Sequence, residues 1–195
     1  MRSLATVATA FGLALAAWAQ PSPAWADQYV LDPEHTEVRF TWDHLGMSRQ
    51  GGRFVDVSGT LDFDELRPDA SKVAVIIKVA SVWTGVASLD SQLVKSREFF
   101  DAAKFPTITF SSTDVRQTSA KTADVTGDLT INGLARPVVL AVTWNYAGAH
   151  PMAKINPAFS DQYVAGFSAQ ALAGLFAHCM SSSVALLTSP DRLAD

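Results

Sequence analysis

The sequence has 195 residues, a length that suits one domain. Its 48% hydrophobic and 17% charged residues are typical of a globular protein and exclude a disordered chain. The formal net charge of -4, with no basic run, gives no electrostatic reason to expect nucleic-acid binding.

The first 26 residues have the pattern of a cleavable signal peptide. Arg2 precedes an apolar, Ala-rich run, and Ala24-Trp25-Ala26 is a small-x-small cleavage site. We therefore expect residues 1–26 to be removed and the mature chain to be periplasmic or secreted. The alternative is a retained membrane anchor, although the run is short and is interrupted by Pro21 and Pro23. No later segment is apolar enough to predict a transmembrane span in the mature chain.

Alternation of apolar and polar residues predicts about seven strands. They are expected at Glu37–Asp43, Val55–Phe63, Lys72–Trp83, Thr107–Thr113, Val125–Ile131, Val138–Tyr146 and Gln162–Ala171. Lys72–Trp83 is apolar on both faces, which predicts a strand that is covered on both sides for much of its length. Asn132-Gly133 predicts a type I′ turn, because both residues tolerate a positive φ.

One short helix is predicted before the Thr107 strand. Leu89, Leu93 and Phe100 fall on one stripe at steps of about 3.6 residues. Asp90 is the expected N-cap, and Pro106 forbids continuation. An all-β fold with one short helix follows, and antiparallel pairing is favoured because strands do not alternate with long helices. The pattern alone leaves a sandwich and a barrel open.

Several segments, in a fixed order, resemble the signature of the YceI-like family. They include Leu31-Asp32 with His35-Thr36, His44-Leu45-Gly46, Ser81–Gly85, Ser96–Ala102, Phe105–Thr113, Gly127–Gly133 and Ala165–Ala169. That family consists of secreted bacterial lipocalin-like barrels that bind polyisoprenoid lipids. The resemblance covers roughly Tyr29 to Ala171. It implies a single antiparallel lipocalin-like β-barrel domain over residues 27–171.

The C-terminal tail, residues 172–195, departs abruptly from that resemblance. The family pattern would continue with a turn and a strand pair that closes the barrel, and none of it is present. A reading-frame shift near codon 172 is one hypothesis; a divergent end is the other. If the tail is genuine, the closing strands must come from Leu172–Met180 and Val184–Leu187. The sequence therefore leaves closure of the barrel open.

Motifs for catalysis are missing from the sequence. There is no Gly-x-Ser-x-Gly elbow, no phosphate-binding loop and no dinucleotide fingerprint. Asp62, Asp64 and Glu65 lie beside a predicted turn and are interpreted as a solvated face. We predict neither an enzyme nor a cofactor.

The histidines His35, His44, His150 and His178 form no ligand pair, so no metal site is predicted. Cys179 is the sole cysteine, which excludes an intramolecular disulfide, and it receives no function.

Bulky aromatic side chains are the main functional signal. In a sandwich they would fill a solid core, whereas in a barrel they can line an interior that holds one slender ligand. The predicted lining residues are Phe40, Trp42, Phe63, Trp83, Phe100, Phe110, Trp144 and Phe167.

For a polar head group, the candidates are His35, His44, Arg97 and Arg136. Equally, the histidines can satisfy barrel-end hydrogen bonds and the arginines can serve solubility. The expected function is non-catalytic binding, sequestration or transport of a polyisoprenoid or similar long-chain lipid. The alternative is a β-sandwich structural or stress-response module with a solid core and no ligand.

Overall fold

The computed structural model describes residues 26–173 and 180–189, and these residues are mostly in strands. The strands are β1 (Asp27–Leu31), β2 (Glu37–His44), β3 (Ser48–Phe54), β4 (Val57–Phe63), β5 (Lys72–Lys78), β6 (Val82–Trp83), β7 (Thr107–Ser119), β8 (Thr122–Ile131), β9 (Leu134–Ala149), β10 (Tyr163–Ala173) and β11 (Met180–Ser189). The helices are α1 (Ala87–Lys95) and three short 3₁₀ turns, η1 (Pro68–Ala70), η2 (Val79–Ser81) and η3 (Pro157–Phe159).

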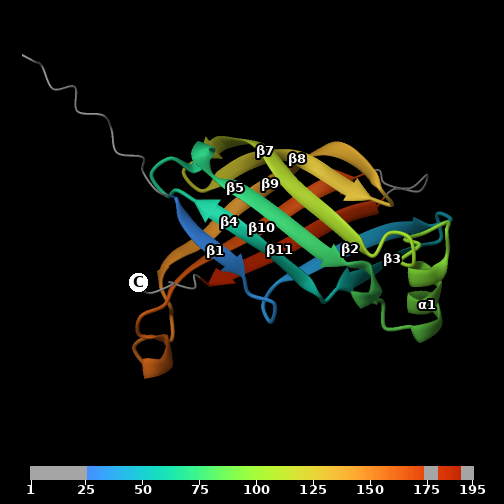
Figure 1. Cartoon of the computed structure of the whole chain (residues 1–195), viewed down its shortest axis with the longest axis horizontal. Helices are drawn as coiled ribbons and strands as arrows, with labels where there is room; N and C mark the ends of the chain where they lie inside the picture. Colours follow the sequence, from blue (N-terminus) through green and yellow to red (C-terminus); the bar gives the residue numbers. More distant parts are fainter. Residues whose placement is uncertain (1–25, 174–179, 190–195) are drawn as a thin grey trace, which may run out of the picture.

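The strands form one antiparallel barrel (Figure 1). Hydrogen bonding runs in the order β1-β4-β5-β7-β8-β9-β10-β11, and β11 pairs back with β1. The hairpin of β2 and β3 continues the wall, since β2 also pairs with β11, and β6 pairs with β3. The barrel predicted from the family resemblance is therefore confirmed. The alternative of two packed sheets is wrong, because the ladder of strands returns to its start.

The barrel is closed by a strand from the atypical tail. The backbone of β11 pairs with β10 from Ala165↔Thr188 to Ala173↔Met180. On its other side β11 pairs with β2 and then with β1. The predicted strand at Val184–Leu187 lies inside β11. Residues 1–25, 174–179 and 190–195, which include most of the leader and Cys179, are outside the described residues, and the reading-frame hypothesis stays a prediction.

The Lys72–Trp83 segment is not one continuous covered strand. The 3₁₀ turn η2 interrupts it, and Val79 within that turn is buried. On β5 the outer residue Ile76 is 46% exposed, so that face is open. Alternation restarts after η2, so that Val82 is buried while Trp83 points outward. The sequence pattern missed this interruption because the apolar residues run straight through it.

Helix α1 lies at one end of the barrel (Figure 1). Its inner face carries the buried Leu93, and Phe100 follows in the segment after the helix. The expected N-cap is wrong: Val86 occupies that position without a side-chain cap. Asp90 lies in the first turn, and its Oδ1 accepts hydrogen bonds from the backbone N–H and the hydroxyl of Thr84 at 2.7 and 2.6 Å. Asp90 thus fixes the chain entering the helix instead of capping it.

The β8–β9 hairpin has the predicted two-residue turn. Asn132 and Gly133 have φ values of 51° and 73°, and Ile131 pairs with Leu134. Both positive φ values match a type I′ turn. The Asn132 amide also donates to the carbonyl of Phe99, which ties this hairpin to the segment after α1.

Candidate binding cavity

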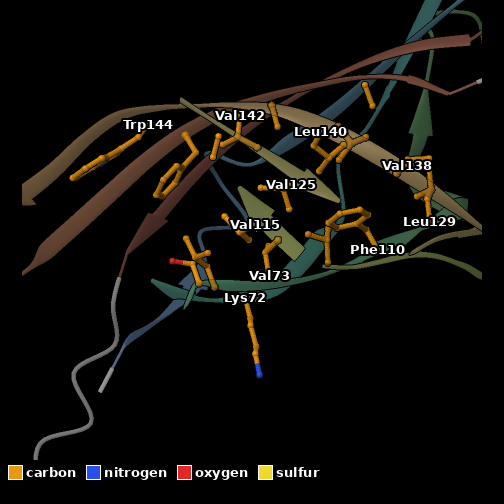
Figure 2. Close-up of a pocket in the computed structure, with 18 of the residues that line it drawn as sticks. Lys72, Val73, Phe110, Val115, Val125, Leu129, Val138, Leu140, Val142 and Trp144 are labelled. Atoms are coloured by element: carbon orange, nitrogen blue, oxygen red, sulfur yellow. The ribbon is translucent and has the colours of Figure 1, made fainter. Parts of the chain in front are cut away.

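The interior of the barrel holds a cavity of about 190 Å³ (Figure 2). Its wall comes from most strands of the ring and is almost entirely hydrocarbon. The wall includes Val38, Phe40, Phe54, Leu61, Phe63, Val73, Val75, Ile77, Phe100, Ile108, Phe110, Val115, Val125, Leu129, Ile131, Val138, Leu140, Val142, Trp144, Phe167, Ala169 and Ala171. An apolar cavity of about 150 Å³ is already large enough to stay dry and to bind a small hydrocarbon. The interior is therefore not packed solid.

Strand β9 illustrates how the sequence builds this wall. Its even-numbered residues Val138, Leu140, Val142 and Trp144 line the cavity, as Figure 2 shows, while Val139 is 53% exposed on the outer face. This is the period-two alternation of a strand with one face inward.

On the neighbouring strand β8, a glycine keeps room for an aromatic wall residue. A Cβ at Gly127 would lie 2.5 Å from both the Phe110 ring and the Ser111 carbonyl oxygen. The absent side chain lets the Phe110 ring lie over β8 at Gly127.

One end of the cavity is closed by aromatic rings. Phe40, Phe54 and Phe100 are almost fully buried, with ring centroids 5.2 to 6.0 Å apart. Phe100 packs edge-to-face on both of the other rings, and such packing stabilises beyond the buried area alone. Because Phe100 follows α1 directly, this closed end is the α1 end of the barrel.

The opposite end reaches the surface at the β7–β8 hairpin. Exposed residues Gln117, Lys121 and Thr122 border the cavity there. The Lys121 ammonium lies 5.8 Å from the centroid of the Trp144 ring, and the backbone N–H of Trp144 donates to the Lys121 carbonyl at 2.8 Å. Lys72 also borders the cavity, but Figure 2 shows its ammonium pointing away from the lining side chains.

Most of the aromatic residues predicted as lining do line this cavity. They are Phe40, Phe63, Phe100, Phe110, Trp144 and Phe167. Trp42 is not among the lining residues; it lies closer to the β2–β3 turn and stacks on Phe40 at 5.7 Å. Trp83 is 51% exposed on the outside, under the Arg53 guanidinium, because η2 shifts the alternation. The contact of the six lining residues with a ligand stays a prediction.

None of the four head-group candidates borders the cavity. His44, Arg97 and Arg136 are exposed. His44 is the last residue of β2, Arg97 follows α1, and Arg136 lies in β9 beside the β8–β9 turn. The latter two therefore lie near the closed end. His35 is exposed in the turn between β1 and β2. Lys121 was not predicted from the sequence. Its place in a turn between two strands is the only signal, and no local sequence pattern shows which end of a barrel is open.

His35 instead forms an ion pair with a neighbour in its own turn. Its Nδ1 lies 2.6 Å from Asp32 Oδ2, and this hydrogen bond raises the pKa of His35. The same bond, with backbone N–H groups, lowers the pKa of Asp32 despite the opposing effect of burial. The pair is a local turn contact.

Asp32→Asn is expected to lower the pKa of His35 toward its ordinary value of 6.5, because the charged acceptor is lost. A raised folded-state pKa contributes stability below the ordinary pKa, and that contribution is lost as the pH rises through the folded-state pKa. The mutant should therefore lose the contribution of the raised His35 pKa, which is present at low pH, and only slightly, since the pair is exposed. An NMR titration of the His35 ring measures the shift; an unchanged pKa would refute it.

The acidic cluster predicted as a solvated face is partly structural. Asp64 is buried and accepts hydrogen bonds from the backbone N–H groups of Leu66 and Arg67 and from the Arg67 side chain. Burial opposes its ionisation, but these bonds prevail and lower its pKa. Glu65 accepts from the Tyr163 hydroxyl, which raises the pKa of Tyr163 to about 12. These carboxylates hold the β4–β5 turn and β10 in place.

Within residues 26–173 and 180–189, no three or more His, Cys, Asp or Glu side chains gather where they could hold a metal ion. Over the same part of the chain, no helix has the length and hydrophobicity to cross a membrane.

The family comparison agrees with this architecture. The model of the YceI-like domain matches residues 29–173. The chain belongs to the YceI-like family. A UPF0312 protein from Pseudomonas savastanoi pv. phaseolicola is a YceI-like relative that is 43% identical over 155 residues, which is 78% of this chain and 79% of that protein.

Two solved structures share the YceI-like fold at low sequence identity. Burkholderia cenocepacia BcnA has a TM-score of 0.63 and 20% identity, covering 82% of this chain and 98% of BcnA. A polyisoprenoid binding domain from Saccharophagus degradans, implicated in plant cell wall breakdown, has a TM-score of 0.58 and 13% identity, covering 85% of this chain and 99% of that domain.

Proposed function

We propose that this YceI-like protein binds a polyisoprenoid or similar long-chain lipid without covalent chemistry, and sequesters or transports it. The observation that carries this proposal is a hydrocarbon-lined cavity that is closed at the α1 end and reaches the surface at the β7–β8 hairpin. Such a cavity admits a slender lipid chain through its open end and leaves the outer end of that chain near water.

The free energy of transfer supports a lipid as the occupant. Removing one CH₂ group from water is worth about 0.8 kcal/mol. A chain of several isoprenoid units therefore gains enough from burial to offset the loss of translational freedom on binding. The hydrocarbon wall offers few hydrogen-bond partners to a polar metabolite, so length and shape would set specificity.

The comparisons support the same class of ligand. Family membership and the fold shared with the Saccharophagus degradans polyisoprenoid binding domain make a prenyl lipid the first one to test. The proposal includes no catalytic step, since the cavity wall is almost entirely hydrocarbon.

The signal-peptide pattern of residues 1–26 supports a periplasmic or secreted location, where a carrier would move a water-insoluble lipid through an aqueous space. N-terminal sequencing of protein from the periplasmic fraction should give Asp27 as the first residue. A chain that stays with the membrane and keeps its leader would contradict this location.

Native mass spectrometry of the purified protein, followed by lipid extraction, tests the function. We expect a co-purifying lipid, or uptake of an added prenyl lipid at one molecule per chain. A denatured sample of the same preparation controls for lipid carried along by contamination. Protein that neither carries a lipid nor takes up an added prenyl chain would refute the proposal.

A further inference from the structure

The cap at the α1 end of the barrel reaches the cavity through a single side chain. Between Ile77 on β5 and Ile108 on β7 the chain passes through η2, β6 and α1, and the structure describes all of this connection. Of its residues, Phe100 alone borders the cavity. Its neighbours Phe40 and Phe54 belong to β2 and β3 and are part of the barrel wall. Phe100 therefore lies at the end of the cavity, where the wall residues lie along its side.

Hydrogen bonds fix the backbone that carries this ring. The backbone N–H of Phe100 donates to the carbonyl of Leu93 on α1 at 3.1 Å. The carbonyl of Phe99 accepts from the side-chain amide of Asn132 in the β8–β9 turn. The Phe100 ring is 2% exposed. It is thus anchored to both the helix and the hairpin, as an end wall of the cavity requires.

On the helix side of Phe100, α1 adds nothing to the cavity wall. Leu93 is 4% exposed and belongs to the same buried cluster as Phe100, but it does not border the cavity. The tail of a lipid chain that meets the Phe100 ring can therefore go no further toward α1. Any additional length of that chain has to stay at the open end, in water.

We propose that the Phe100 ring is the end stop of the cavity and sets the longest prenyl chain that the protein buries in full. This inference rests on the proposed function and adds the length selectivity of the same site. Each CH₂ group that enters the cavity should raise the affinity by about fourfold. The affinity should level off once the tail reaches Phe100, because further units gain nothing from burial.

A series of all-trans prenyl alcohols, from geraniol through farnesol and geranylgeraniol to longer members, locates this break point. Each member adds one isoprenoid unit, and competition between neighbouring members in native mass spectrometry gives their relative affinities. We expect a gain of at least about tenfold for each unit below the break point and of less than about twofold for each unit beyond it.

Variants at the closed end should move the break point in opposite directions. Phe100→Ala and Phe100→Leu shorten the stop, so the first alcohol beyond the wild-type break point should gain about fourfold or more over the last one before it. Phe100→Leu keeps a bulky side chain and serves if Phe100→Ala does not fold. Ile131→Phe should move the break point to a shorter alcohol, because Ile131 borders the cavity next to Asn132, which is tied to the Phe99 carbonyl.

Leu93→Ala is the matched control, because it truncates a buried residue of the same cluster that does not border the cavity. Its break point should be that of the wild-type protein. An equal shift in Leu93→Ala and Phe100→Ala would mean that a loosened α1 end, and not the ring, admits the longer chain, and would overturn the inference.

Two further results would overturn the inference while the proposed function stands. One is an unchanged break point in the Phe100 variants and in Ile131→Phe. The other is a wild-type affinity that keeps rising with chain length and shows no break point. If none of the prenyl alcohols binds the wild-type protein, the proposed function fails and the inference fails with it.

Discussion

Val142→Trp is expected to weaken lipid binding by at least about tenfold while leaving the barrel folded. Val142 lies on the inner face of β9, midway between Leu140 and Trp144, and its side chain borders the cavity. An indole there occupies space that a prenyl chain would need, and each CH₂ group displaced to water forfeits about 0.8 kcal/mol. Loss of only two such groups already lowers affinity by about tenfold.

The control for this prediction is Val139→Trp. Val139 is on the same strand but is 53% exposed on the outer face, so the same substitution adds the same bulk outside the barrel. We expect native mass spectrometry to show lipid on the control and little on Val142→Trp, with circular dichroism alike for both. Equal lipid occupancy in the two variants would show that the cavity is not the binding site.

Phe100→Ala is expected to lower the free energy of unfolding by about 3–5 kcal/mol, the range for removing a buried aromatic ring. Phe100 is 2% exposed and contacts both Phe40 and Phe54, with centroids 6.0 and 5.4 Å away. The substitution removes the ring that joins the segment after α1 to the closed end of the cavity.

Urea denaturation of Phe100→Ala measures this loss, with Leu66→Ala as the control. Leu66 is 92% exposed in the β4–β5 turn, and its truncation should change stability by less than about 0.5 kcal/mol. A loss below about 1 kcal/mol for Phe100→Ala would mean that the closed end is not held by this ring cluster.

The strands with clean alternation were predictable from the sequence because each has one face inside the barrel. β9 is the best case, with Val138, Leu140 and Val142 inward and polar or exposed residues between them. The Asn132-Gly133 turn was predictable for a local reason as well, since its backbone needs two positive φ values.

Strands β1 and β3 were missed because their local pattern is weak. β1 has five residues, and β3 reads Ser-Arg-Gln-Gly-Gly-Arg-Phe, with Phe54 alone buried. Their pairing with β4 and β2 is decided by neighbours in the sheet, which a single segment does not reveal.

The candidate site, like the strands, was predictable from the sequence only in part. The lining aromatics follow from period-two rows, but Trp83 was misplaced because η2 changes the face without changing the hydrophobicity of the segment. The residues at the open end, Lys121 and Trp144, meet through the register of β8 on β9. Such contacts depend on tertiary structure and leave no local sequence pattern. The head-group candidates chosen from the sequence therefore lie elsewhere.

The pairing of Val30 with Ser189 has a consequence for how the chain folds. Joining these partners requires contacts between distant parts of the sequence, and proteins rich in such contacts fold slowly. Until Met180–Ser189 docks, β1, β2 and β10 expose unpaired backbone that can attach to other chains. A newly made polypeptide would therefore pass through an unsealed, aggregation-prone intermediate, and a chaperone that masks strand edges should raise its yield.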